Sequence, residues 1–308
     1  MVIPASWTVK RLAGALGAEI SGVDIRNATE SDINALRQLL LQHLVIFLPH
    51  QSPTPEEHVE FARNFGELEG HPNLGGAEGL PPELFQLAAS QGGIADEWHT
   101  DITFSESPPL MSVLHLVTCP PFGGDTMWGS LYAAYDGLSQ PMKELCEGLT
   151  ALHDALPHNR PEAMAIHPVV RTHPETGRKA LYVNPHFTRR IVELSAPESE
   201  VLLNYLTRFI SSERFTVRYQ WRPGSIGIWD NRCTCHYVLN DFEGERVIQR
   251  ATVMGDRVEA AAPSRWEPAV TQGRLSAMDR HDQQLFNFLR DTGHIPDDTV
   301  GYTDLLKN

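Results

Sequence analysis

Residues 94–103 read IADEWHTDIT and have the pattern of the start of a β-strand. In an extended segment successive side chains alternate between two faces, so His99 and Asp101 point the same way and Thr100 points the other way. Two side chains able to ligate a metal would then lie about one side-chain width apart and could bind a single ion. They could equally form an ordinary polar strand edge, and the rest of the sequence has to decide between these interpretations.

Short strand-like segments account for most of the chain on both sides of this stretch. They are rich in β-branched and aromatic residues and are separated by turn-forming sequences such as PPFGGD, HPETGRK and RPGS. Eight or so strands at short spacing, with helices mainly outside the series, favour a sandwich or barrel over a parallel βαβ sheet. The predicted strands are LFQLAA (84–89), MSVLHLVT (111–118), DTMWGS (125–130), HPVVRTH (167–173), KALYV (179–183), FTVRYQW (215–221), SIGIWD (225–230) and RVIQRATVMG (246–255).

Helices flank this series of strands. Leucines recur with helical spacing in residues 30–44, which lead into the apolar strand VIFLP. Residues 54–65 begin with a capping box formed by Thr54 and Glu57, and residues 195–212 repeat the same device. The sequence therefore predicts a mainly β fold with flanking helices.

The composition changes after Gly255. The sequence EAAAPSRWEPAV is loop-like, and DRHDQQLFNFLRD has the pattern of a terminal helix. We therefore predict one domain over residues 1–256 and a C-terminal appendage, loop plus helix, over residues 257–308.

The overall composition excludes several classes of protein. The 308 residues carry a formal net charge of −14, which argues against binding to a nucleic-acid backbone. No apolar run approaches the length of a membrane span, and the N-terminal sequence lacks a signal-peptide core. Four cysteines in a chain of this length do not form a secreted disulfide framework. We expect a cytoplasmic protein without a membrane or nucleic-acid partner.

A third metal ligand is offered by His236 in the segment WDNRCTCHYVLNDF. The alternative is a hydrogen-bonded histidine in the core or at a strand edge. Cys233 and Cys235 could suggest zinc, but this spacing lacks the usual pair of Cys-x₂₋₄-Cys motifs, so we interpret both as small buried residues of a strand end.

Two arginines, Arg246 and Arg250, are spaced four apart in a predicted strand and therefore share a face. Arginine on the inner face of an apolar strand is costly unless it meets an anion, although a surface ion-pair face is the alternative. Two histidines and one carboxylate on one face of a metal leave three open positions, as in non-haem Fe(II) oxygenases. A 2-oxoglutarate cosubstrate would fill two of these positions and dioxygen the third, and arginine suits the distant carboxylate of 2-oxoglutarate.

The chain resembles the taurine dioxygenase (TauD/TfdA) family of Fe(II)- and 2-oxoglutarate-dependent dioxygenases. The matching stretches occur in the family's order and are GALGAEISGVDI, WHTDITF, FGGDTMWGS, HPVVRTHPETGRKALYVN, IWDNRCTCHYVLNDF and RATVMGD. The resemblance implies a double-stranded β-helix (jelly-roll) core, which agrees with the strand count. It also implies that His99, Asp101 and His236 are the iron ligands.

Further roles follow from the same resemblance. Thr126 and Arg246 resemble the pair that holds the distant carboxylate of 2-oxoglutarate, and Arg250 resembles the arginine that lies near the chelating carboxylate and meets an anionic substrate group. The resemblance also implies substrate contacts, with ordinary core packing as the alternative for the apolar ones, at His71, Ile102, Phe104 and Phe187.

Two departures from the family's pattern bear on the substrate. Ala95 stands where the taurine-cleaving members have an asparagine, and the segment after His153 and Asp154 is shorter than theirs. We therefore expect an enzyme that hydroxylates a small organic anion other than taurine, with an apolar portion, and releases succinate and CO2. Cleavage of a C–S or C–O bond could follow. The competing hypothesis is a non-redox metal-binding jelly-roll protein or hydrolase, and in either case we expect a homo-oligomer.

Overall fold

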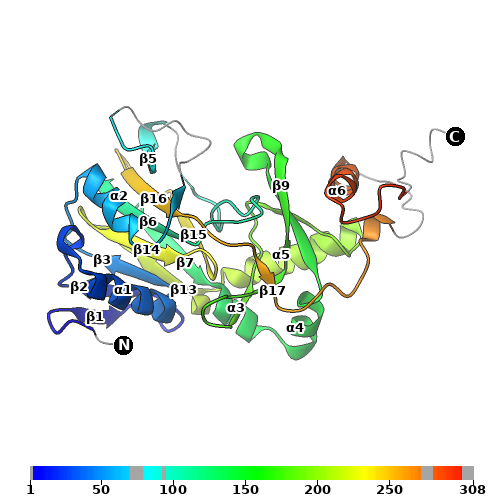
Figure 1. The fold of residues 1–308 in the computed structure, drawn as a ribbon, viewed down its shortest axis with the longest axis horizontal. Coiled ribbons are helices and arrows are strands. Elements are labelled where there is room, and N and C mark those ends of the chain that lie inside the picture. The colour runs from blue at the N-terminus through cyan, green and yellow to red at the C-terminus, as the bar shows by residue number, and fades with distance from the viewer. Residues whose placement is uncertain (1–2, 70–78, 92–94, 272–279, 300–308) are drawn as a thin grey trace.

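A large sheet and a small sheet face one another in this computed structural model, which describes residues 3–69, 79–91, 95–271 and 280–299 (Figure 1). All strand pairs in the two sheets are antiparallel except β2 with β3, and the core is a jelly roll, as predicted. The large sheet has the order β1 (Thr8–Arg11), β2 (Ala18–Ser21), β3 (Val45–Leu48), β14 (Ile226–Asp230), β6 (Met111–Thr118), β16 (Val247–Val253) and β4 (Leu68–Glu69), with β5 (Leu84–Ala88) also paired to β16. The small sheet has the order β13 (Thr216–Tyr219), β7 (Thr126–Ser130) and β15 (Thr234–Val238).

Both faces of the large sheet are buried, which explains why its central strands are continuously apolar. Phe47 of β3 points between the two sheets, while its neighbours Ile46 and Leu48 point to the outer face. Between the sheets, the Phe47 ring stacks on Tyr219 of β13 at 3.7 Å between centroids and meets Trp128 of β7 at 5.1 Å. These aromatic contacts join the two sheets and form the main core.

Helices α1 (Glu30–His43) and α2 (Pro55–Arg63) cover the outer face of the large sheet (Figure 1). Each begins with a capping box, in which the threonine side chain and the residue three positions later satisfy each other's free N–H groups. Their leucine, isoleucine and valine side chains pack against the outer apolar row of the sheet, including Val113 and Ile228. Both helices lie close to the bounds predicted from the sequence.

The small sheet is backed by α3 (Leu131–Gly137) and α5 (Ala196–Ile210). The packing is tight at Gly129, where an added Cβ would lie 2.9 Å from Cys235 Sγ and 3.2 Å from the Ile210 carbonyl oxygen. Cys233 and Cys235 are buried at the start of β15 and are not disulfide-bonded, in agreement with their interpretation as small core residues.

A second set of strands extends beyond the jelly roll. The C-terminal helix packs on it, with Leu285 and Phe286 against Leu152, and a buried ion pair joins Asp282 to Arg190 at 2.8 Å. The helix predicted at residues 279–291 is confirmed over residues 280–291, whereas the division of the chain at residue 256 stays a prediction. These elements are β8 (Thr150–Ala155), β9 (Arg160–Pro168), β12 (Thr188–Ile191), β10 (Val170–Thr172), β11 (Lys179–Leu181), β17 (Glu259–Ala260), α4 (Gln140–Cys146) and α6 (Arg280–Asp291).

Within the described residues, none of the helices has both the length and the apolar character needed to cross a bilayer.

Candidate active site

The segment that carries His99 joins the edge of the small sheet. The backbone of His99 exchanges two hydrogen bonds with that of His236 in β15, with N···O distances of 3.0 and 2.7 Å. Thr100 points to the opposite side, where its hydroxyl donates to the Thr234 carbonyl at 2.8 Å. The predicted strand is wrong, because the segment forms only this isolated bridge and turns at Asp101, but His99 and Asp101 still lie on the side opposite Thr100.

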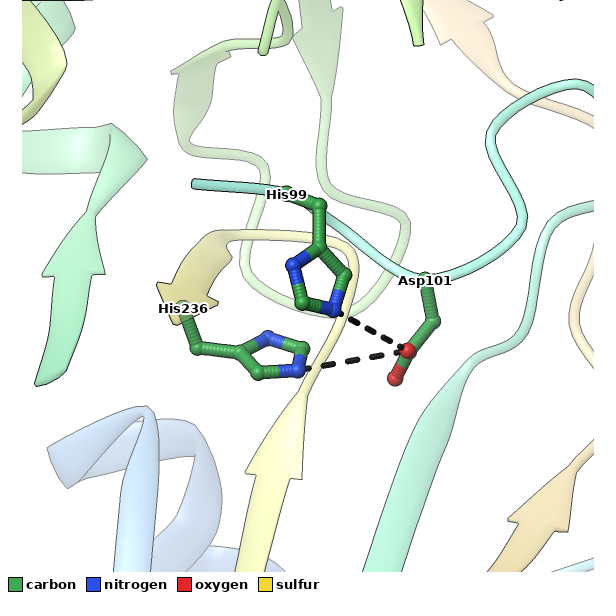
Figure 2. A group of neighbouring side chains, drawn as sticks. All are labelled: His99, Asp101 and His236. Carbon is green, nitrogen blue, oxygen red and sulfur yellow. Dashed lines mark ion pairs between the residues drawn. The ribbon is translucent and has the colours of Figure 1, made fainter. Parts of the chain in front are cut away.

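The side chains of His99, Asp101 and His236 converge at this edge (Figure 2). The Nε2 atoms of the two histidines lie 3.8 and 3.9 Å from Asp101 Oδ1, and one ligand atom from each residue lies within 4.8 Å of the other two. All three side chains are buried. The sequence placed two of them close together, and the fold brings in the third from a strand 135 positions later in the chain.

The protonation states suit a divalent metal. Nδ1–H of His99 donates to the Glu97 carbonyl at 2.8 Å, which leaves the Nε2 lone pair directed toward the cluster. Burial lowers the pKa of both histidines, so their imidazoles are neutral near neutral pH, as metal ligation requires. Burial opposes ionisation of Asp101, but the charged Arg250 guanidinium and the hydrogen bond from Ser112 hold the pKa of this carboxyl below its usual range. Two imidazole nitrogens and a carboxylate oxygen match the donor set that holds Fe(II) in non-haem oxygenases.

A buried hydrogen-bond chain fixes the orientation of Asp101. Its Oδ2 accepts from the Ser112 hydroxyl at 3.0 Å, and Ser112 in turn accepts from the Asn231 amide at 3.2 Å. The side-chain oxygen Oδ1 of Asn231 accepts a hydrogen bond from Trp229 Nε1–H at 2.9 Å. Such outer contacts set the geometry and basicity of a metal ligand. Sequence reasoning did not find Ser112 or Asn231, although Ser112 occupies an inward position of the predicted strand 111–118.

The two arginines predicted to share a face make different contacts near the site. Arg250 Nη1 binds Asp101 Oδ1 at 2.7 Å. Arg246 is buried, donates from Nε to the Gly124 carbonyl at 3.2 Å, and lies 3.5 Å from the Thr126 hydroxyl. Burial lowers the pKa of Arg246 to about 10.

Within the described part of the chain, no carboxylate lies within ion-pair distance of Arg246. A buried cation without a neutralising partner is costly, so this position is suited to the carboxylate of a ligand. The structure thus brings Thr126 and Arg246 together, and their role in holding 2-oxoglutarate stays a prediction.

An apolar cluster lies next to the metal-binding residues. Ile102, Phe104 and Phe187 pack together with Ala155, and the Phe187 ring lies 6.5 Å from that of His99. Ile102 has a φ of 50°, an unusual value for a β-branched residue, and directs the chain sharply away after Asp101. The three apolar residues predicted to form the pocket wall are therefore adjacent to the site, and contact with a substrate stays a prediction. His71 lies outside the described residues.

Two further histidines near this cluster were missed by sequence reasoning. His186 Nδ1–H donates to Glu97 Oε2 at 2.6 Å, and the His186 ring lies 5.7 Å from that of His99. His158 lies 5.9 Å from His186, between ring centroids, in the segment after Asp154 that is shorter than in the taurine-cleaving members. Isolated histidines have no spacing signal, so only the fold brings them to the site.

A second cluster with metal-binding residue types, His173, Asp230 and Cys233, has a structural role. Nε2–H of His173 and the Arg232 guanidinium both donate to Asp230, at 3.0 Å and at 2.7–2.9 Å. Nδ1 of His173 accepts from two backbone N–H groups of the following turn, which leaves the neutral ring without a free lone pair. Burial raises the pKa of Cys233 well above its usual value, so the thiol stays protonated. The groups of this cluster satisfy one another without an ion.

The chain is similar to known proteins over most of its length. The family model described as "Taurine catabolism dioxygenase TauD, TfdA family" matches residues 8–252. The chain is 35% identical over 271 residues to an alkylsulfatase of Acinetobacter baylyi, covering 80% of this chain and 85% of that protein. It is also 35% identical over 271 residues to an alpha-ketoglutarate-dependent sulfate ester dioxygenase of Pseudomonas putida, covering 80% and 89%.

Two solved structures have the same fold. A taurine dioxygenase from Burkholderia xenovorans superposes with a TM-score of 0.76 at 38% identity, covering 83% of this chain and 93% of the other. AAD-2, in complex with Mn(II) and N-oxalylglycine, superposes with a TM-score of 0.73 at 26% identity, covering 82% and 99%.

Proposed function

Because the chain belongs to the TauD/TfdA family and is a 2-oxoglutarate-dependent non-haem iron dioxygenase, we propose that it hydroxylates a small organic anion at the His99, Asp101 and His236 centre. The observation that carries this proposal is that two features lie close together, since Thr126 beside Arg246 pairs with Val238, two residues beyond His236. One is a buried donor set of two neutral imidazoles and one carboxylate, and the other is the buried guanidinium of Arg246, which has no acidic partner among the residues that the structure describes. A metal-dependent hydrolase would need the metal-binding residues, but it has no 2-oxoglutarate carboxylate for Arg246 to bind.

Each residue of the site has a distinct task in this proposal. His99, Asp101 and His236 hold Fe(II), which, together with 2-oxoglutarate, supplies the activation of dioxygen when it is bound. Arg246 and Thr126 bind the distant carboxylate of 2-oxoglutarate and so fix its orientation. The apolar surroundings exclude water from the reacting C–H bond.

The substrate class follows from the charges around the pocket. Arg250 lies beside the metal-binding carboxylate and offers a cation to an anionic substrate group, and His71 is proposed to assist it. Ile102, Phe104 and Phe187 offer an apolar surface to the rest of the molecule. We therefore propose a sulfonate, sulfate ester or carboxylate with an apolar portion. If the hydroxylated carbon also carries the sulfonate sulfur or an ester or ether oxygen, the product is unstable and the C–S or C–O bond breaks.

A succinate-release screen tests this proposal. The purified protein, supplied with Fe(II) and 2-oxoglutarate, is offered alkyl sulfates, sulfonates and carboxylates, the matching neutral alcohols, and taurine. We expect succinate to be released fastest with an alkyl anion, more slowly with taurine, and negligibly with the neutral alcohols. Equal turnover of neutral and anionic compounds would contradict the assignment of Arg250, and a preference for taurine would contradict the expected apolar portion.

A further inference from the structure

His158 lies at the outer end of the apolar cluster. It is the last residue of the short 3-10 turn η3 (Leu156–His158), which follows β8, and Asn159 then reverses the chain with a φ of 56°. The imidazole ring lies 5.7 Å from Phe104 and 5.4 Å from Phe187, measured between centroids, and it is nearly perpendicular to both. Two edge-to-face contacts therefore hold the ring against the proposed pocket wall.

The polar edge of this ring is available to a ligand as far as the described residues are concerned. His158 is exposed, and its nitrogens form no hydrogen bond with the described residues. The ring of His186 lies 5.9 Å from that of His158 and 5.7 Å from that of His99, measured between centroids. His99, His186 and His158 therefore form a row that leads from the metal-binding residues to the solvent. Nδ1 of His186 already donates to Glu97, whereas both ring nitrogens of His158 are available to a ligand.

We propose that His158 is a specificity residue whose imidazole N–H donates a hydrogen bond to an oxygen in the distal part of the substrate. This inference rests on the proposed function and specifies the apolar portion of the substrate. A substrate chain lying along Phe104 and Phe187 would displace water from this apolar surface, so an ether or carbonyl oxygen in the chain would lose a hydrogen bond to water, which costs free energy unless the protein replaces it. His158 removes that penalty, and the site then favours an apolar chain interrupted by an oxygen over one made of carbon alone.

A pair of isosteric substrates and three variants isolate this hydrogen bond. Hexyl sulfate and 2-propoxyethyl sulfate have chains of the same length and differ in one ether oxygen. His158→Phe keeps a flat ring on the apolar wall and removes the N–H, whereas His158→Gln keeps a donor and removes the ring. Leu156→Ala, at an exposed position of the same turn, is the matched control.

We expect the wild-type protein to favour the ether in kcat/KM by about five- to tenfold, the equivalent of one neutral hydrogen bond. His158→Phe should reduce this ratio to about one, mainly through a higher KM for the ether, because the hydrogen-bond donor is removed. His158→Gln should keep part of the preference, and Leu156→Ala should keep all of it. Dissociation constants measured by calorimetry under argon should show the same ratios.

Two different failures can be told apart. If the wild-type protein turns over both esters and the ratio is the same in His158→Phe, the inference is wrong and the proposed function stands. If the wild-type protein shows the same kcat/KM for both esters, the inference is also wrong and the proposed function again stands. If neither these esters nor any other organic anion supports succinate release, the proposed function fails and the inference fails with it.

Discussion

Replacing Arg246 with methionine should change stability and cosubstrate binding in opposite directions. Burial lowers the pKa of this guanidinium from 12.5 to about 10, which corresponds to a penalty on the order of 3 kcal/mol for the charged form. Methionine fills similar space without charge, but it leaves the Gly124 carbonyl without its donor, at a cost of about 1 kcal/mol. The ligand-free Arg246→Met variant should therefore be more stable than the wild-type protein by about 2 kcal/mol.

The same variant should lose 2-oxoglutarate. Removing the cationic partner of a buried carboxylate costs about 2–5 kcal/mol, so the dissociation constant should rise by roughly 30- to 4000-fold. Arg246→Lys should recover only part of this loss, because lysine lacks the bidentate geometry. Urea denaturation of the ligand-free proteins gives the first quantity, and the 2-oxoglutarate dependence of succinate release gives the second. A destabilised Arg246→Met variant with an unchanged 2-oxoglutarate requirement would refute the reasoning and make Arg250 the first candidate for the role.

Two further predictions concern the support of the site and of the core. Ser112→Ala removes the donor that orients Asp101, so Fe(II) affinity measured by anaerobic titration should fall by about 10- to 100-fold with little change in melting temperature; unchanged affinity would remove this contact from the site. Burial lowers the pKa of His58 and His167 from 6.5 to about 4, so the unfolded chain binds more protons between these pH values. The free energy of unfolding should therefore be fully present above pH 6.5 and fall toward pH 4, by on the order of 3 kcal/mol per histidine, and His58→Gln should flatten this fall in urea titrations.

Two of the metal-binding residues were accessible to sequence reasoning because their signal is local. The spacing of His99 and Asp101 predicts that both lie on one side of the chain, and the hydrogen bond from Thr100 to the opposite side agrees with this, although the segment forms an isolated bridge and a turn in place of a strand. His236 needed the resemblance to a family, since nothing in its own surroundings distinguishes a ligand from a core histidine. The central strands of the large sheet were equally clear, because burial on both faces makes them continuously apolar.

Sequence analysis missed strands that are stabilised by residues far away in the chain. The strands β8 and β9 mix histidine, charged residues and proline, and their apolar side chains are covered by the C-terminal helix, more than a hundred residues away. The contact between Ser112 and Asn231 joins positions 119 apart and leaves no pattern in the sequence. His158 reaches the pocket only because η3 connects those two missed strands.

Anaerobic titration of the protein with Fe(II) and 2-oxoglutarate tests the central claim most directly. The wild-type protein should bind one Fe(II) per chain and then develop the weak visible charge-transfer band of an iron–2-oxoglutarate chelate. His99→Ala, Asp101→Ala and His236→Ala should each lose the band while keeping a cooperative thermal transition, because two remaining ligands hold the ion poorly. An Asp101→Ala variant that binds Fe(II) tightly and shows the full band would contradict the account.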